Sequence, residues 1–201
     1  MASDLPNWHR RHPAFTLVEL QVAISIFVVM ALLIGGVYFA YTKLFNEERI
    51  RVHVASENRV AIDEITNQIR ESPGVTTNCT ICAGQTTSSQ TVLILKLWPT
   101  DSTGEVFEPT SGQFDYIVYR VGSPPNDKNL LKEIFPNGID SYRINSTKIL
   151  SSDVKSIQFT YDTPLDLAAS SEVTVALTNE AQSFSRTHTI SQTSRAVLRN
   201  K

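Results

Sequence analysis

Apolar residues are concentrated near the start of the chain and give way to alternating patterns after Tyr41. The twenty residues from Val22 to Tyr41 are almost wholly apolar, and Ser25 is the one clearly polar exception. A helix of this length spans roughly 30 Å, the thickness of the hydrocarbon core of a bilayer. The pattern therefore predicts a membrane-spanning helix over residues 15–41.

The helical pattern continues beyond this segment. Residues 42–72 contain neither proline nor glycine, and Pro73-Gly74 is predicted to end the helix. Small, apolar or amide residues recur at spacings of three and four, typical of an amphipathic helix that packs one face on another element. They are Ala55, Asn58, Ala61, Ile62, Ile65 and Ile69. The charged residues between them, which include Glu57 and Glu64, are expected on a solvated face.

Residues 73–201 have the composition of a β-rich globular head. Runs of β-branched and aromatic residues predict strands at 91–98, 114–121, 129–135, 154–161 and 172–178, with a final strand within 186–200. The loop GSPPNDK between the second and third runs predicts an antiparallel hairpin. The expected fold class is α+β: a long N-terminal helix whose amphipathic part packs on a small antiparallel sheet of five or six strands.

Charge favours a cytoplasmic N-terminus. His9, Arg10, Arg11 and His12 precede the apolar segment, and positive residues stay on the inner side of a membrane. A cleaved secretory signal fits poorly, because the apolar run is too long and no small-x-small site follows it. An uncleaved signal anchor remains open. The formal net charge of the 201 residues is −2, so nothing indicates nucleic-acid binding through excess positive charge.

Glu19 needs a separate explanation, because a carboxylate at the edge of an apolar segment is costly and commonly functional. Residues 14–25, AFTLVELQVAIS, resemble the processing site of the type IV pilin superfamily, which also includes the pseudopilins of type II secretion and competence systems. The resemblance implies that a leader, residues 1–14, is removed between Ala14 and Phe15, and that prepilin peptidase then methylates the amine of Phe15. Ala14 stands where the family usually has glycine.

The same resemblance gives Glu19 a role in assembly, as the fifth residue of the mature chain. Its carboxylate would pair with the Phe15 amine of a neighbouring subunit and fix the axial register, because both charges need partners in a low-dielectric layer. Without the surrounding motif, the simpler interpretation is that Glu19 lies among the lipid headgroups.

The order of the predicted elements and the terminal VLRN (197–200) resemble the J-type minor pseudopilins and the W-type minor pilins. This similarity implies a structural, non-enzymatic and minor subunit of a type IV pilus or a type II secretion-like pseudopilus. It would span the bacterial cytoplasmic membrane once and then enter an extracytoplasmic filament. Implied partners are prepilin peptidase, other pilins or pseudopilins through their N-terminal helices, and, indirectly, an assembly platform and ATPase. No cofactor and no nucleic-acid partner of the head are expected.

Cys79 and Cys82 form a C-x-x-C within a polar loop, and a disulfide that rigidifies residues 76–84 is the simplest interpretation. A redox site is the alternative. Zinc would need two further ligands, and His53 and His188 offer no ligand spacing. Asp162 and Asp166 have side chains suited to calcium but also to turns. The sequence lacks the nucleophile elbow, zinc-protease and P-loop motifs.

Two other classes of function remain open. One is a signal-anchored extracytoplasmic binding module that enters no filament. The other is a redox or metal enzyme built on the C-x-x-C.

Overall fold

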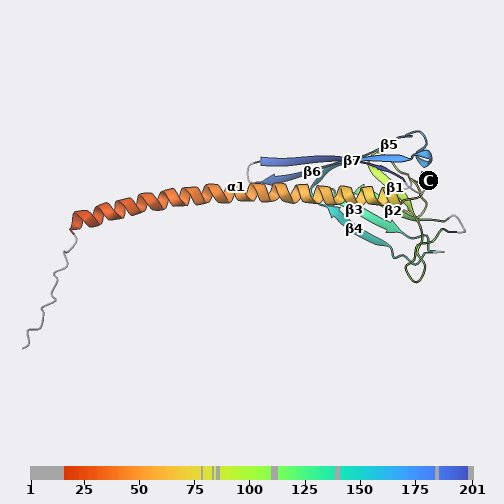
Figure 1. The fold of residues 1–201 in the computed structure, drawn as a ribbon, viewed down its shortest axis with the longest axis horizontal. Helices are drawn as coiled ribbons and strands as arrows, with labels where there is room; N and C mark the ends of the chain where they lie inside the picture. Colours follow the sequence, from red (N-terminus) through yellow and green to blue (C-terminus); the bar gives the residue numbers. More distant parts are fainter. Residues whose placement is uncertain are drawn as a thin grey trace, which may run out of the picture. The chain divides into compact units, whose positions relative to one another are not determined.

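The computed structural model describes residues 16–77, 79–82, 84, 87–109, 113–138, 141–183 and 186–198. Within these ranges the chain forms one α-helix, a short 3-10 helix and seven strands (Figure 1). The elements are α1 (Leu17–Glu71), β1 (Val92–Leu97), β2 (Asp115–Val121), β3 (Leu130–Phe135), β4 (Ser146–Ser151), β5 (Val154–Tyr161), η1 (Leu167–Ala169), β6 (Glu172–Ser183) and β7 (Arg186–Val197).

The single long helix predicted from the sequence is confirmed, and it passes through two compact units, residues 1–46 and 47–201. It ends where expected, one residue before Ser72 and two before Pro73. The Ser72 hydroxyl holds the chain beside β1 just after the helix ends, since it donates to the carbonyl of Lys96 at 2.9 Å.

The described part of the first unit is the helix from Leu17 to Asn46, and its apolar side chains are exposed along its length. In its most apolar stretch no residue is buried by another part of the chain. Ser25 satisfies its hydroxyl locally by donating to the carbonyl of Gln21 at 2.8 Å. By length and composition this segment is compatible with a single-pass membrane anchor.

The second unit contains two antiparallel sheets rather than the one sheet that the sequence predicted. Four strands pair in the order β1-β2-β3-β4, and three pair in the order β5-β6-β7. All six predicted strands form, and β2 and β3 make the predicted hairpin. The missed strand is β4 (Ser146–Ser151), a short and mostly exposed edge strand with only two β-branched residues.

The helix packs on both sheets through the predicted stripe. Seven residues of α1 are buried: Val54, Asn58, Ala61, Ile62, Ile65, Thr66 and Ile69. Ala55 is only half-buried, and Val54 takes its place.

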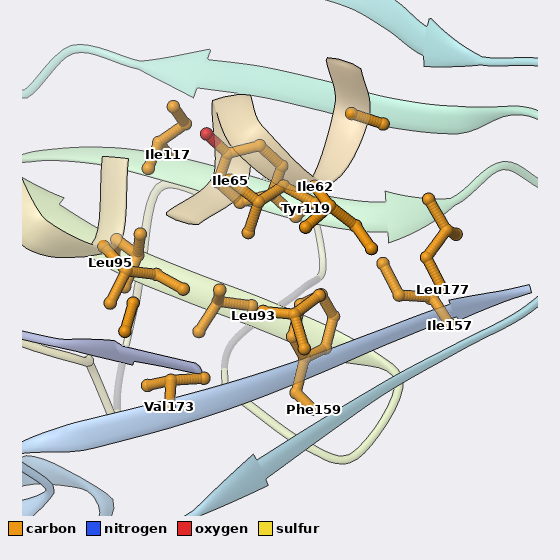
Figure 2. Close-up of a cluster of buried hydrophobic side chains, with 14 of the residues drawn as sticks. Ile62, Ile65, Leu93, Leu95, Ile117, Tyr119, Ile157, Phe159, Val173 and Leu177 are labelled. Atoms are coloured by element: carbon orange, nitrogen blue, oxygen red, sulfur yellow. The ribbon is translucent and has the colours of Figure 1, made fainter. Parts of the chain in front are cut away.

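Figure 2 shows side chains from α1, β1, β2 and the three-stranded sheet meeting in one core, with Leu93 of β1 near its centre. Ile62, Ile65 and Tyr119 in this core are fully buried. Because both sheets contribute to the core, the helix stabilises each of them by burying apolar surface.

Candidate functional site

Glu19 lies in the first turn of α1, where it forms a capping box with Thr16. The backbone N–H and the hydroxyl of Thr16 each donate to Glu19 Oε2 at 3.0 Å, and the N–H of Glu19 donates to Thr16 Oγ1 at 3.2 Å. This reciprocal arrangement satisfies two backbone N–H groups that a helix start otherwise leaves without partners. Glu19 therefore has a local role that our sequence analysis missed, although the T-x-x-E spacing signals it.

The other residues of the predicted processing site, Ala14 and Phe15, lie outside the described residues. Cleavage between them, methylation of Phe15 and pairing of its amine with Glu19 stay predictions. Glu19 itself is exposed in the isolated chain, so its carboxylate is accessible to another molecule.

Two adjacent glycines in the apolar segment leave room for a second helix to pack closely against its backbone. At Gly35 and at Gly36 nothing lies within 4 Å of the position that a Cβ would occupy. Small residues on one side of an apolar helix let a second helix pack closely against its backbone. The surrounding Leu33, Ile34 and Val37 are exposed in the isolated chain and supply apolar contact area.

The C-x-x-C is bridged in the structure by a disulfide between Cys79 and Cys82. Both cysteines are only 1% exposed and pack with Ile94, Val118 and Phe135 in a second apolar cluster. These strand residues alternate with the α1-facing residues of β1 and β2, so the cluster lies on the face of the four-stranded sheet that points away from α1. The disulfide loop covers this face, and its burial supports a structural role over a redox role.

The predicted solvated face of α1 needs a correction at two carboxylates. Glu57 Oε2 accepts hydrogen bonds from the backbone N–H (3.1 Å) and hydroxyl (2.9 Å) of Ser152, in the turn between β4 and β5. Glu64 accepts a hydrogen bond from Lys132 Nζ of β3, and this bond lowers the pKa of the Glu64 carboxyl. The two side chains connect the helix to the head, because the sheets bring residues distant in sequence beside it.

Asn58 is the polar member of the buried stripe and anchors the helix to the three-stranded sheet. Its side-chain amide donates to Asn179 Oδ1 at 2.8 Å and to the carbonyl of Leu177 at 3.2 Å. Asn179 in turn donates to the hydroxyl of Ser151 and to the carbonyl of Ser152. This buried network ties α1, β6 and the turn after β4 together, and buried amides without such partners would destabilise the fold.

The two candidate calcium ligands act within a turn. Asp162 accepts hydrogen bonds from the N–H and hydroxyl of Ser171, which lower the pKa of its carboxyl to about 2. Asp166 caps η1 by accepting from the N–H of Ala169 at 3.2 Å. Among the described residues there is no group of three or more His, Cys, Asp or Glu side chains that could hold a metal ion.

The two histidines considered as ligands lie on different elements. His53 of α1 lies 3.3 Å from Glu57 and lines a polar cavity of about 420 Å³ with Lys128, Asp153 and Glu180. His188 is on β7, opposite Ala181. The cavity is lined by charges of both signs, which gives no clear preference for one class of ligand.

We compared the chain with protein-family models, with curated proteins and with solved structures, and none of the three comparisons gave a match.

Proposed function

We propose that the protein is a structural subunit, of the minor type, in a type IV pilus or type II secretion-like pseudopilus. After processing by prepilin peptidase, the apolar part of α1 packs among the helices of neighbouring subunits, and the head projects outward. The protein catalyses no reaction in this role. The chain passes through the cytoplasmic membrane once and is then drawn into the filament.

One observation carries the proposal: a single helix is apolar and uncovered over Leu17–Asn46 but packs on its own head over residues 47–71. An uncovered apolar segment needs lipid or other helices, because its exposed side chains would otherwise contact water. Gly35 and Gly36 suit close helix packing, and the sequence FTLVEL sets Glu19 at the start of this segment.

The first test is mass spectrometry of the N-terminal peptide recovered from the membrane fraction of the native host. The expected result is a chain that begins at N-methylated Phe15. A chain that still carries residues 1–14 contradicts processing and favours a signal-anchored binding module that never enters a filament.

The second test separates the capping role of Glu19 from its role in assembly. Glu19→Gln removes the charge but keeps an oxygen that accepts from Thr16, whereas Thr16→Val removes the hydroxyl and keeps the charge. If the Glu19 charge pairs with the Phe15 amine of a neighbour, Glu19→Gln abolishes recovery of the protein in sheared filaments and Thr16→Val lowers it only modestly. The opposite ranking would show that the cap alone matters.

A further inference from the structure

Strand β7 is an edge of the three-stranded sheet, and its exposed side is long and regular. The strand (Arg186–Val197) pairs with β6 over twelve consecutive residues without a register shift, and among the described residues it pairs with no other strand. Soluble proteins usually protect such an edge with prolines, bulges, charges or a covering element, because exposed peptide groups invite another strand. Apart from arginines near its two ends, β7 has no such protection from the part of the chain that the structure describes.

The hydrogen bonds of β6 show which peptide groups of β7 face outward. The N–H of Glu180 donates to Asp153 and the carbonyl of Glu172 accepts from Asp162, so even-numbered residues of β6 point away from β7. The peptide groups of successive residues in a strand point in opposite directions. Those of odd-numbered residues of β6 therefore face β7, where their partners are even-numbered residues. The peptide groups that face the outer edge belong to residues 187, 189, 191, 193, 195 and 197, all of which are exposed.

Two contacts fix the direction of β7 relative to the helix it lies beside. Asn58 donates to the carbonyl of Ile190, and Thr66 donates to the hydroxyl of Ser194. Eight helical residues and four strand residues both span roughly 12–13 Å, so β7 runs parallel to this part of α1. A two-fold symmetric β7–β7 pair would set two α1 helices antiparallel. Copies anchored in one membrane cannot adopt that arrangement, an argument that rests on the proposed function.

Charge indicates what kind of strand fits this edge. Strand β7 contains two arginines, Arg186 and Arg195, and no aspartate or glutamate. Arg195 pairs with Glu172 across the sheet, yet its side chain remains 71% exposed. The strand itself is thus basic, whereas the formal net charge of the 201 residues is −2.

We propose that the outer edge of β7 is a docking site for an extended, acidic segment of another protein, which adds a fourth strand to the sheet. Main-chain hydrogen bonds to the outward peptide groups between Thr187 and Val197 supply affinity, as in other cases of strand addition. Carboxylates of the incoming segment near Arg186 and Arg195 supply selectivity against basic segments.

The test uses the full chain in detergent micelles and a synthetic acidic peptide, TETVTVTET, with TKTVTVTKT as its charge-reversed control. Amide hydrogen exchange is followed by NMR. The acidic peptide is expected to slow exchange at Thr187, Thr189, Ser191 and Thr193 by at least about tenfold, because these N–H groups become hydrogen-bonded. The basic peptide is expected to have a much smaller effect, and added salt to weaken the acidic one.

The matched variant is Ser191→Pro. Its lost N–H faces outward, so the β6–β7 ladder keeps its hydrogen bonds, and proline is tolerated on an edge strand. Unchanged protection of the even-numbered amides of β7 would show that the variant folds, and loss of peptide binding would then support the proposal.

Three results overturn the proposal: no protection of the outward amides, equal protection by both peptides, or a dimer of the chain that Ser191→Pro dissociates. None of these measurements involves filament assembly or N-terminal processing. A failure here therefore leaves the proposed function intact, and a failure of processing leaves the peptide result intact.

Discussion

The two parts of α1 are continuous in backbone and opposite in environment. From Leu17 to Asn46 the apolar side chains are exposed. Over residues 47–71 one stripe of them is buried against two sheets, while Val52 and Val60 on the outer face stay exposed. Exposure of Ile34 is 66% and that of Ile65 is 0%. Isoleucine therefore has a different role in each part. Ile65 stabilises the head, whereas Ile34 is available to contact lipid or a neighbouring helix.

This difference teaches that the head needs only the second part of the helix for its own core. The first part is held by its capping box and its backbone hydrogen bonds, and its apolar surface contributes to stability only when something else covers it. Substitutions in the two parts should therefore affect different measurements.

The largest effect is expected from Ile65→Ala. Removal of a fully buried isoleucine side chain loses apolar burial and leaves a cavity, so the free energy of unfolding of the head should fall by about 3 kcal/mol. Urea unfolding of the full chain in detergent, followed by tryptophan fluorescence, measures this loss. The matched variant Ile34→Ala should leave the midpoint unchanged, and a comparable shift for both would contradict the division of the helix.

Asn58→Ala should rank next, with a loss of about 2 kcal/mol in the free energy of unfolding. The change leaves buried partners on β6 without their donor. Asn67→Ala is the control on the same helix, because Asn67 is exposed. Thermal unfolding by circular dichroism distinguishes the two, and equal midpoints would show that the network does not stabilise the docked helix.

Removal of the disulfide should lower the free energy of unfolding by about as much as Asn58→Ala, or slightly less. The double variant Cys79→Ala with Cys82→Ala releases a short ring, for which loop closure predicts a loss of about 2 kcal/mol at most. Amide exchange should rise at Ile94 and Val118, which the loop covers, and should be unaffected at Ile65 under the helix. Faster exchange throughout the head would mean that the loop supports the whole fold rather than one face.

The smallest effect is the acid dependence caused by Asp162. Its pKa is about 2 in the folded chain and close to 3.8 when unperturbed, so its contribution is complete above pH 4 and is lost as the pH falls toward 2. Because the carboxylate is exposed to solvent, the contribution should be no more than about 1 kcal/mol. Asp162→Asn should flatten that part of the curve of unfolding free energy against pH, and an unchanged slope would contradict the role of the Ser171 bonds.

The sequence was sufficient to predict the helix, its end, six strands and the hairpin, since these depend on local patterns. It did not predict how the strands divide between two sheets, because strand pairing depends on contacts between residues far apart in the chain. The short strand β4 gave too few apolar residues to stand out from its loop.

Only part of the candidate site could be predicted, because some of its contacts are local in sequence and others join residues far apart in the chain. The capping partner of Glu19 was readable from T-x-x-E, a signal that we overlooked. The continuous apolar run of β1 also indicated burial on both faces, and thus a cover for the second face. The contacts of Glu57 and Glu64 were not readable, because Ser152 and Lys132 approach the helix only in the folded head.

The parallel course of β7 and the docked part of α1 has a mechanical consequence. A pull along the helix would load the contacts of Asn58 and Thr66 with the sheet at the same time, in shear, rather than peeling them apart one after another. Shear distributes a force over many bonds, so the head should stay attached to a helix under tension for longer than if the same contacts were loaded one at a time. Resistance of this kind is set by the rate of forced unfolding.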